Sequence, residues 1–312
     1  MRSVSLSRSC AALLVSWVAW AGGCATKPPA VTKPPAAAKP AQVSIREQAV
    51  RFRGADVELS GILFEPASPA PGGERRPAAV LMHGCGGMLT SRGALPAGRR
   101  DWAERIARRG YVVLMVDSFT PRGVRSVCEI VGSERPAQPW EVRVADAYSA
   151  LEYLVGRANV DPENVLVAGW SHGGSTVTGV VRPEALGRSV TGPHFRAAIA
   201  FYPGCIRPLR LKSYRTTMPM LILHGEEDDW TPVKPCIELT EKLRNSPFPP
   251  ELIVYPGAHH GFDSPGGRII YRSNVYNPRA PGGRGAHAGG HEPSRLKAIE
   301  DVNRFLDRNL AR

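Results

Sequence analysis

The sequence has no run of five or more charges of one sign, although 40 Lys and Arg residues against 28 Asp and Glu residues give a formal net charge of +12. Clustered basic residues are the pattern that attracts nucleic acids and anionic membranes. Here the arginines are scattered along the chain. The dispersal indicates an arginine-rich solvated surface, and we expect no nucleic-acid partner.

The sequence also lacks an apolar run long enough to cross a bilayer, which takes about 20 residues in a helix. Its apolar segment near the N-terminus, residues 10–21, is shorter and follows Arg2 and Arg8. A positive start, a short apolar segment and then small residues are typical of a signal peptide. We therefore predict that residues 1–23 are a signal peptide.

Small residues at positions 21–23 lead directly into Cys24, which resembles the cleavage box of bacterial lipoproteins. In those proteins the cysteine is acylated and becomes the new N-terminus, so Cys24 is predicted to carry a lipid anchor in the bacterial envelope. Simple secretion with cleavage after Ala21 is the alternative, because Trp20 stands where lipoproteins usually have Leu. Ala25, rather than Asp, follows the cysteine, which favours the periplasmic face of the outer membrane over the inner membrane.

Residues 24–42 consist mainly of Pro, Ala and Lys, with the same five residues repeated at 26–30 and 32–36. Such a segment cannot bury a core, and its prolines favour an extended spacer. No other internal repeat is evident. We predict that this linker tethers one folded domain over residues 43–312.

Short apolar runs alternate with helical patterns through that domain. Two strands, at 49–53 and 57–64, are expected to form a hairpin. Further strands are predicted at 78–82, 111–116, 165–168, 197–201, 220–223 and 252–255. Apolar residues at helical spacing predict helices at 101–109, 144–155, after Gly174 and at 296–310. Strands that are apolar on both sides and separated by helices predict a doubly wound α/β domain with a mostly parallel sheet and helices on both faces.

Cysteine is scarce in the predicted mature chain. Removal of Cys10 and acylation of Cys24 leave four: Cys85, Cys128, Cys205 and Cys236. An even number in an exported protein allows two disulfides, with three possible connectivities. Cys205 and Cys236 each follow a predicted strand at the same end of the sheet, so we expect these two to pair, with Cys85–Cys128 as the second bridge.

The sharpest motif is Gly-Trp-Ser-His-Gly at residues 169–173, which follows the strand at 165–168 and precedes a helix. G-x-S-x-G between a strand and a helix is the arrangement of a nucleophile elbow, in which a tight turn exposes the serine. The motif alone also occurs at ordinary turns in glycine-rich chains. Its placement therefore carries the prediction that Ser171 is a nucleophile.

A serine hydroxyl is a weak nucleophile at neutral pH and needs a base that a carboxylate orients. In this fold the three residues follow in the order Ser, Asp, His. The acidic turn after 220–223 offers Asp228 or Asp229 as the orienting carboxylate. After the last predicted strand, His259 and His260 compete for the role of the base.

An acyl-transfer site also needs two backbone donors for the oxyanion. One is the N–H of His172, the residue after the nucleophile. The other is expected from the His-Gly-Cys-Gly-Gly loop at 83–87, at the N–H of Cys85. Because both donors belong to the main chain, replacing the Cys85 side chain should cost less than removing a donor.

The glycine-rich stretch at 281–290, with His287 and His291 nearby, could suggest a metal tract. The sparse histidines and the absence of Cys or acidic partners favour a flexible loop instead, and no metal site is predicted. Since the stretch follows His260, a second possibility is that it borders the substrate entrance.

Five motifs together resemble the dienelactone hydrolase family: residues 83–87, 116–119, 169–174, 228–232 and 255–262. The resemblance covers the chain from about residue 50. It implies an eight-stranded α/β-hydrolase fold without a metal or organic cofactor. It also implies the triad Ser171, Asp228 and His260, because the family's orienting aspartate usually lies three residues after the glycine and four before the proline, and its histidine usually precedes Gly-Phe.

The chain departs from the enzymes that named the family, which use a cysteine nucleophile and a glutamate near the strand-three loop. Here the nucleophile position holds Ser171, and Cys85 lies in that loop. We therefore expect a carboxylesterase-like serine hydrolase that acts on a small ester or acyl substrate through an acyl-enzyme, with His260 as base and then acid.

Other functions share parts of this pattern. A serine peptidase of the prolyl-oligopeptidase type has the same fold and triad order, but no propeller-length N-terminal domain is present. An acyltransferase would use the same residues and differ only in its product. A non-catalytic envelope binding protein on a hydrolase scaffold is the third alternative, although such proteins commonly lack a triad member and none is missing here.

Overall fold

A computed structural model describes residues 43–183 and 192–310 of the chain. The predicted signal peptide, the predicted lipidation site Cys24 and the predicted linker lie outside the described residues.

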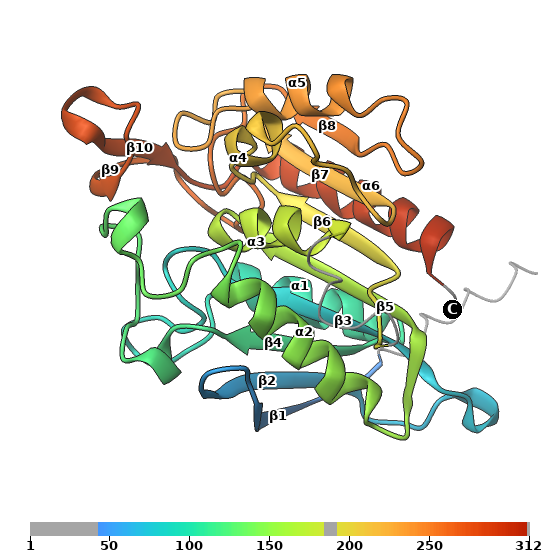
Figure 1. Ribbon diagram of the computed structural model, residues 1–312. Helices are drawn as coiled ribbons and strands as arrows, with labels where there is room; N and C mark the ends of the chain where they lie inside the picture. The colour runs from blue at the N-terminus through green and yellow to red at the C-terminus, as the bar shows by residue number, and fades with distance from the viewer. Residues whose placement is uncertain (1–42, 184–191, 311–312) are drawn as a thin grey trace, which may run out of the picture. The chain divides into compact units, whose positions relative to one another are not determined.

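An eight-stranded sheet occupies the centre of the fold, with the strand order β1-β2-β4-β3-β5-β6-β7-β8 (Figure 1). β1 pairs antiparallel with β2 and β2 antiparallel with β4, whereas all later neighbours are parallel. The prediction of an eight-stranded, mostly parallel α/β-hydrolase sheet is therefore confirmed. The strands are β1 (Ile45–Arg53), β2 (Glu58–Pro66), β3 (Arg76–Met82), β4 (Val112–Asp117), β5 (Val160–Trp170), β6 (Ala197–Phe201), β7 (Met220–Gly225) and β8 (Glu251–Tyr255).

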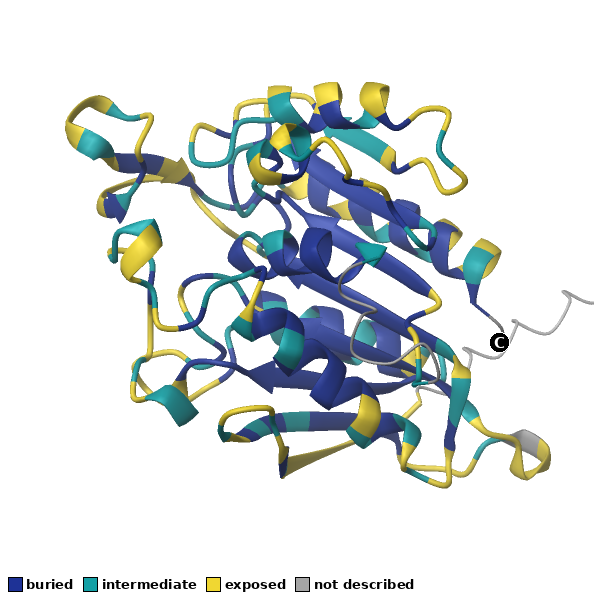
Figure 2. Ribbon diagram, viewed as in Figure 1, coloured by how far each residue is buried: buried dark blue, intermediate teal, exposed yellow. Residues whose placement is uncertain are grey.

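Helices cover the sheet on both faces, as Figure 2 shows by the buried strands between partly exposed helices. α1 and α6 contribute to the hydrophobic cluster on one face, and α2, α3 and α5 contribute to the cluster on the other. The helices are α1 (Ala97–Arg108), α2 (Val142–Val155), α3 (His172–Val180), α4 (Ile206–Arg210), α5 (Lys234–Lys242) and α6 (Glu292–Asn309).

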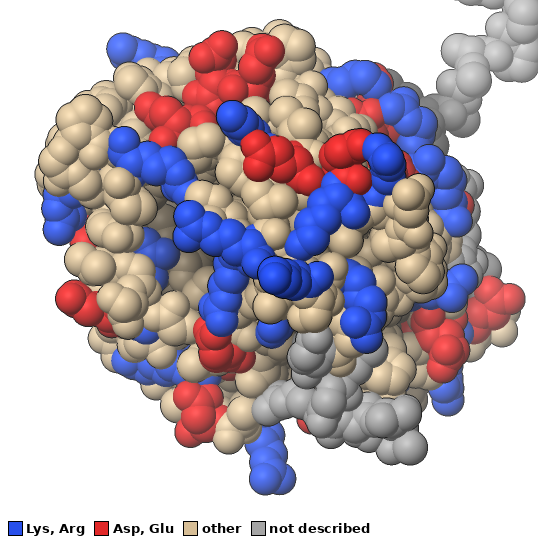
Figure 3. All heavy atoms as spheres, turned by 45° about the horizontal axis from the view of Figure 1, so that its top comes forward, with Lys and Arg blue, Asp and Glu red and all other residues tan. Residues whose placement is uncertain are grey.

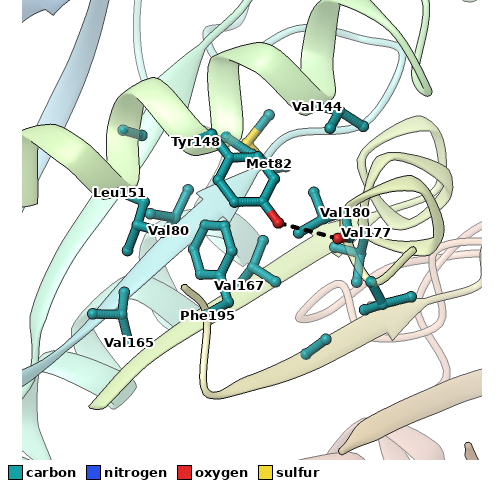
Figure 4. Close-up of a cluster of buried hydrophobic side chains, with 14 of the residues drawn as sticks. Val80, Met82, Val144, Tyr148, Leu151, Val165, Val167, Val177, Val180 and Phe195 are labelled. Atoms are coloured by element: carbon teal, nitrogen blue, oxygen red, sulfur yellow. Dashed lines mark hydrogen bonds between the residues drawn. The ribbon is translucent and has the colours of Figure 1, made fainter. Parts of the chain in front are cut away.

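Each strand supplies both hydrophobic clusters because successive side chains point to opposite faces of a sheet. In β4, for example, Leu114 joins the cluster under α2 and Met115 joins the cluster under α1. Figure 4 shows the first cluster, in which side chains from β3, β5, α2 and α3 meet around Tyr148. The Tyr148 hydroxyl donates to the carbonyl of Val180 at 3.3 Å. Full burial of each aliphatic side chain contributes about 1.5–3 kcal/mol, so this layer anchors the elements that present the site.

A second, two-stranded sheet pairs β9 (Ile270–Tyr276) with β10 (Arg284–Ala288) and projects from the main sheet (Figure 1). The prediction of a flexible loop over 281–290 was therefore wrong, since the whole of β10 lies there. The pairing register shifts between Arg284 and Ala286, around Gly285 with a φ of 101°. This irregularity breaks the alternation of side chains that would have marked a strand in the sequence.

Both predicted disulfides are confirmed: Cys205 pairs with Cys236, and Cys85 with Cys128.

On the face drawn in Figure 3, Lys and Arg side chains are interspersed with Asp and Glu. No helix within residues 43–183 and 192–310 combines the length and apolarity that crossing a membrane requires.

Candidate active site

Ser171 stands at the sharp turn between β5 and α3. Its backbone has φ 54° and ψ −112°, a conformation that residues other than glycine rarely adopt. Such strain costs about 1–3 kcal/mol. Gly173 permits the turn, because a Cβ there would lie 2.1 Å from the carbonyl oxygen of Met82. The turn thus presents the Ser171 hydroxyl at the carboxyl end of the parallel strands, where open α/β sheets bind ligands.

Two further side chains, from the loops after β7 and β8, form a hydrogen-bonded chain with Ser171. His260 Nε2 lies 2.8 Å from the Oγ of Ser171, and His260 Nδ1 lies 2.8 Å from Oδ2 of Asp228. These three residues lie far apart in the sequence. Each follows a parallel strand, and the carboxyl ends of these strands meet at one edge of the sheet. The structure therefore places the three residues singled out in the sequence in one hydrogen-bonded chain.

Asp228 is held by its own turn. The backbone N–H groups of Trp230 and Thr231 both donate to Oδ1, at 3.0 and 2.8 Å. Burial alone would raise the pKa of the Asp228 carboxyl, but its interactions with His260, His224 and the N–H of Thr231 together outweigh burial and lower it. An ionised Asp228 accepts from Nδ1–H of His260, which leaves Nε2 without a proton and facing Ser171.

The neighbouring residues that competed in the sequence have other partners. Asp229 Oδ2 lies 2.7 Å from Nδ1 of His287, and Asp229 Oδ1 accepts from the backbone N–H of His287. Asp229 therefore ties β10 to the turn that carries Asp228. His259 lies with its ring 5.7 Å from the ring of His287, away from Ser171, and its Nδ1 is buried without a partner in the described part of the chain.

Hydrogen bonds to its backbone carbonyl groups hold the loop at 83–87 in shape. The carbonyl of Gly84 accepts from the N–H of Gly87 at 3.2 Å, and the carbonyl of Cys85 accepts from the N–H of Val127 at 2.8 Å. In a trans peptide the N–H of Cys85 points opposite to the carbonyl of Gly84. That N–H has no acceptor among residues 43–183 and 192–310. It is free to donate to a ligand beside Ser171.

The N–H of His172 likewise has no acceptor in the part of the chain that the structure describes. The carbonyl of Ser171 accepts from Ser175 N–H at 2.7 Å in the first turn of α3. The peptide N–H of His172 therefore points out of the helix terminus, where the first N–H groups lack intrahelical partners. Gly84 lies against Ser171, since a Cβ on Gly84 would be 3.6 Å from the Cβ of Ser171. Both amides predicted as oxyanion donors thus belong to segments that flank Ser171.

A buried carboxylate that the sequence analysis missed anchors the His260 loop. Asp263 is fully buried, and its Oδ2 accepts from Trp102 Nε1 and Trp170 Nε1, each at 2.9 Å, and from Arg99 at 3.0 Å. Its Oδ1 accepts from the Tyr202 hydroxyl at 2.6 Å. Asp263 thereby joins the loop of His260 to α1, to the end of β5 beside Ser171, and to the end of β6.

A cavity of about 430 Å³ opens above Ser171 and His260. Its wall includes the Cys85–Cys128 disulfide, Trp230 and residues 288–290. The second possibility considered for the glycine-rich stretch, that it borders the entrance, agrees with this lining. Among the described residues, no cluster of three or more His, Cys, Asp and Glu side chains could hold a metal ion.

The Cys85–Cys128 disulfide joins the 83–87 loop to the segment that precedes α2. The N–H of Tyr276 in β9 donates to the carbonyl of Cys128 at 2.8 Å, so the same bridge also contacts the β9–β10 hairpin. Cys85 is buried, whereas Cys128 is partly exposed in the cavity wall. The bridge therefore restrains the loop that presents the Cys85 N–H.

We expect a Cys85→Ala/Cys128→Ala double variant to lose about 10- to 100-fold in kcat, because displacing a catalytic group by about 1 Å can cost about 100-fold. The loss should stay below that of deleting an oxyanion donor. Steady-state kinetics of ester hydrolysis measures it. Cys205→Ala/Cys236→Ala is the matched control, because the two bridges close loops of similar length, with sequence separations of 43 and 31.

Each double variant should lose about 4 kcal/mol of unfolding free energy on the chain-entropy model, but only the first should lose activity. Equal kcat for wild type and the Cys85/Cys128 variant would contradict a positioning role for that bridge.

Stability should depend on pH through three buried histidines. Burial lowers the pKa of His83 and His172 well below the usual value, with Arg143 adding to the effect, and burial also lowers the pKa of His224. Below about pH 6.5 the unfolded chain binds protons at these histidines and the folded chain does not. Each histidine therefore removes up to about 1.4 kcal/mol of stability per pH unit as the pH falls below that value.

Urea unfolding at pH 8, 6.5 and 5 measures this dependence, and the midpoint should fall mainly between the last two. His194→Gln, at an exposed position, should leave the dependence unchanged. A midpoint that stays constant from pH 8 to pH 5 would contradict three neutral buried imidazoles.

Comparisons with known proteins agree with the fold. The model of the dienelactone hydrolase family matches residues 59–282 of this chain. A Klebsiella pneumoniae protein described as a dienelactone hydrolase superposes with a TM-score of 0.60 at 18% identity, covering 85% of this chain and 98% of that one. A thermophilic esterase of Thermogutta terrifontis with bound propionate has 25% identity and a TM-score of 0.56, covering 84% and 93%.

A curated α/β-hydrolase of Acanthamoeba polyphaga mimivirus is 27% identical over 146 residues, which is 46% of this chain and 36% of the relative. This chain thus spans about a third of that relative's length. The family model, in contrast, covers well over half of this chain and includes both Ser171 and His260. The chain belongs to the dienelactone hydrolase family.

Proposed function

We propose that the chain is a serine hydrolase that cleaves carboxylic esters through an acyl-enzyme on Ser171. The observation that carries the proposal is the continuous chain from Ser171 Oγ through His260 to Asp228, with 2.8 Å at each link. Free amides on both sides of Ser171 support it. So does membership of the family, together with the likeness to a Thermogutta terrifontis protein that is named an esterase.

The cycle follows from these positions. His260 Nε2 takes the proton of Ser171 as Oγ attacks the acyl carbon, and the oxyanion that forms accepts hydrogen bonds from the N–H groups of Cys85 and His172. His260 then returns the proton to the leaving alkoxide, and the alcohol departs. Water, deprotonated by His260, attacks the acyl-enzyme in the same way, and the product is a carboxylic acid with Ser171 restored.

The experiment is a substrate comparison on the domain that begins at residue 43. Short-chain p-nitrophenyl esters, matched p-nitroanilides of amino acids, and esters in the presence of added alcohols are assayed, and the products are identified. Ester hydrolysis with little anilide cleavage supports the proposal. Anilide cleavage at a comparable rate would indicate a peptidase, and ester products in alcohol at the expense of the acid would indicate a transferase. Inactivity on all three would contradict the proposal.

We also propose that the chain is exported and anchored in the bacterial envelope through a lipid on Cys24. The signal-peptide pattern before Cys24 supports this proposal, and so do two disulfides, which persist in oxidising compartments. Labelling with a clickable palmitate analogue in a bacterial host tests it, with Cys24→Ser beside the wild type. Label on the wild type alone supports the anchor, whereas a soluble wild type without label would indicate simple secretion.

A further inference from the structure

A fully buried arginine lies behind the two segments that carry the free amides. Arg143 is in the first turn of α2 and is 0% exposed. Its Nη1 lies 2.8 Å from Nδ1 of His172, and its Nη2 donates to the carbonyl of His83 at 2.9 Å. One guanidinium therefore contacts both the residue that follows the nucleophile and the residue that begins the 83–87 loop.

The placement of Arg143 is unfavourable for a merely structural cation. No carboxylate in the described ranges lies within ion-pair distance of it; the nearby Asp146 is bound by Arg122 at 2.8 Å. A cation in the first turn of a helix also opposes the helix dipole. Burial lowers the pKa of the Arg143 guanidinium to about 9, against the opposing charges of Asp146 and Asp117, so the group is charged at neutral pH without a direct ion pair among the described residues. An unpaired buried cation is costly.

The contact with His172 fixes that side chain. A guanidinium cannot accept a hydrogen bond, so Nδ1 of His172 must be the acceptor and the ring must be neutral. Burial, with the charge of Arg143, lowers the pKa of His172 well below the usual value, which agrees with a neutral ring. The ring of Phe119 lies 5.0 Å from the Arg143 guanidinium and 5.8 Å from the His172 ring, and packs beside both.

The contact with His83 fixes the other segment. His83 Nε2 accepts from the N–H of Ser118, so its Nδ1–H donates to the carbonyl of Gly84 at 2.7 Å. The side chain of His83 thus orients the peptide between Gly84 and Cys85. The backbone carbonyl of His83 in turn accepts a hydrogen bond from Arg143. The orientation of the Cys85 N–H depends on this short chain of contacts.

We propose that Arg143 is a positioning residue that fixes both backbone donors of the oxyanion hole relative to Ser171. The inference rests on the proposed function, because an oxyanion forms only in acyl transfer. Arg143 does not touch the substrate; it acts through His172 on one side and through His83 on the other. Its loss lets both donor segments shift, which weakens stabilisation of the transition state more than binding of the ester.

The test compares Arg143→Met and Arg143→Lys with Arg157→Met. Arg157 lies just beyond the opposite end of α2 and pairs with Glu65 at 3.0 Å, far along the helix from Ser171. Active sites are counted by fluorophosphonate labelling carried to completion, and kcat is expressed per labelled site. Inhibition constants are measured for a trifluoromethyl ketone, whose adduct places an oxyanion in the hole, and for the matching methyl ketone.

We expect Arg143→Met to lower kcat per site about 100-fold, with KM nearly unchanged, since a displacement of about 1 Å can cost that much. The inhibition constant of the trifluoromethyl ketone should rise by a similar factor, whereas that of the methyl ketone should stay nearly unchanged. Arg143→Lys should fall between wild type and Arg143→Met, because an ammonium cannot span both acceptors as a planar guanidinium does. Arg157→Met should match the wild type per site.

A structural role alone predicts fewer labelled sites with normal kcat per site, and that result would overturn the proposal. If Arg143→Met does not fold, kcat per labelled site is measured for Arg143→Lys and for His172→Leu instead. His172→Leu removes the imidazole that accepts from Arg143 but keeps the backbone N–H of residue 172. Normal kcat per site in both would also overturn it. A wild type that neither labels nor hydrolyses esters would instead remove the proposed function itself.

Discussion

Replacing Ser171 by alanine is expected to lower kcat for ester hydrolysis about a millionfold, as removal of the nucleophilic serine does in a serine protease. The substitution deletes the atom that lies 2.8 Å from His260 Nε2 and leaves no other hydroxyl in that position. Because the acyl-enzyme cannot form, only the slow attack of water within the oxyanion hole remains. Steady-state assays with a p-nitrophenyl ester measure the loss.

Ser175→Ala is the matched control for this prediction. Ser175 lies one turn further along α3, and its hydroxyl accepts from the N–H of Gly204 at 2.9 Å rather than contacting His260. Its loss should cost about 1 kcal/mol of stability and little activity. Retention of a substantial fraction of wild-type kcat by Ser171→Ala would rule out Ser171 as the nucleophile.

Replacing Asp228 by asparagine is expected to lower kcat about 10,000-fold, the effect of leaving the histidine in the wrong tautomer. The asparagine amide would present an N–H to His260 Nδ1 in place of an ionised oxygen. His260 would then carry its proton on Nε2 and could not accept the proton of Ser171. The same ester assay, run at several pH values, measures the loss.

Asp229→Asn separates this effect from a general disturbance of the turn. Asp229 is adjacent in sequence but pairs with His287 on β10, so its replacement should change kcat little. A loss at Asp229→Asn equal to that at Asp228→Asn would contradict the assignment of the orienting carboxylate.

The sequence carried much of this site because several of its determinants are local. The elbow is encoded within 169–173, where a strand pattern ends and small residues surround Ser171. The choice of Asp228 over Asp229 came from the spacing usual in the family that the chain resembles, and the structure supplies a physical reason. Two backbone N–H groups of the turn hold Oδ1 of Asp228, whereas Asp229 points to the hairpin.

The contacts that the sequence could not predict are long-range. Asp263 binds donors that are 61 to 164 residues away, on three different elements. Arg143 looked like one more charged residue at the start of an amphipathic helix, and its burial depends on how α2 packs behind the 83–87 loop. Neither periodicity nor motif spacing reports such contacts, because each needs the full topology.

The β9–β10 hairpin shows a different limit. Its second strand contains Gly285, whose φ of 101° lies in the left-handed region that favours glycine. Glycine-rich composition is also typical of loops. The same residues therefore indicated a flexible loop in the sequence and form a paired strand in the structure.

The most direct test of an acyl-enzyme on Ser171 is mass spectrometry of the protein after reaction with a fluorophosphonate, on a preparation that hydrolyses p-nitrophenyl esters. We expect one adduct, on the peptide that contains Ser171, with activity lost in proportion and with substrate slowing the labelling. An active preparation that carries no adduct, or carries it on another residue while activity is lost, would contradict Ser171 as the nucleophile.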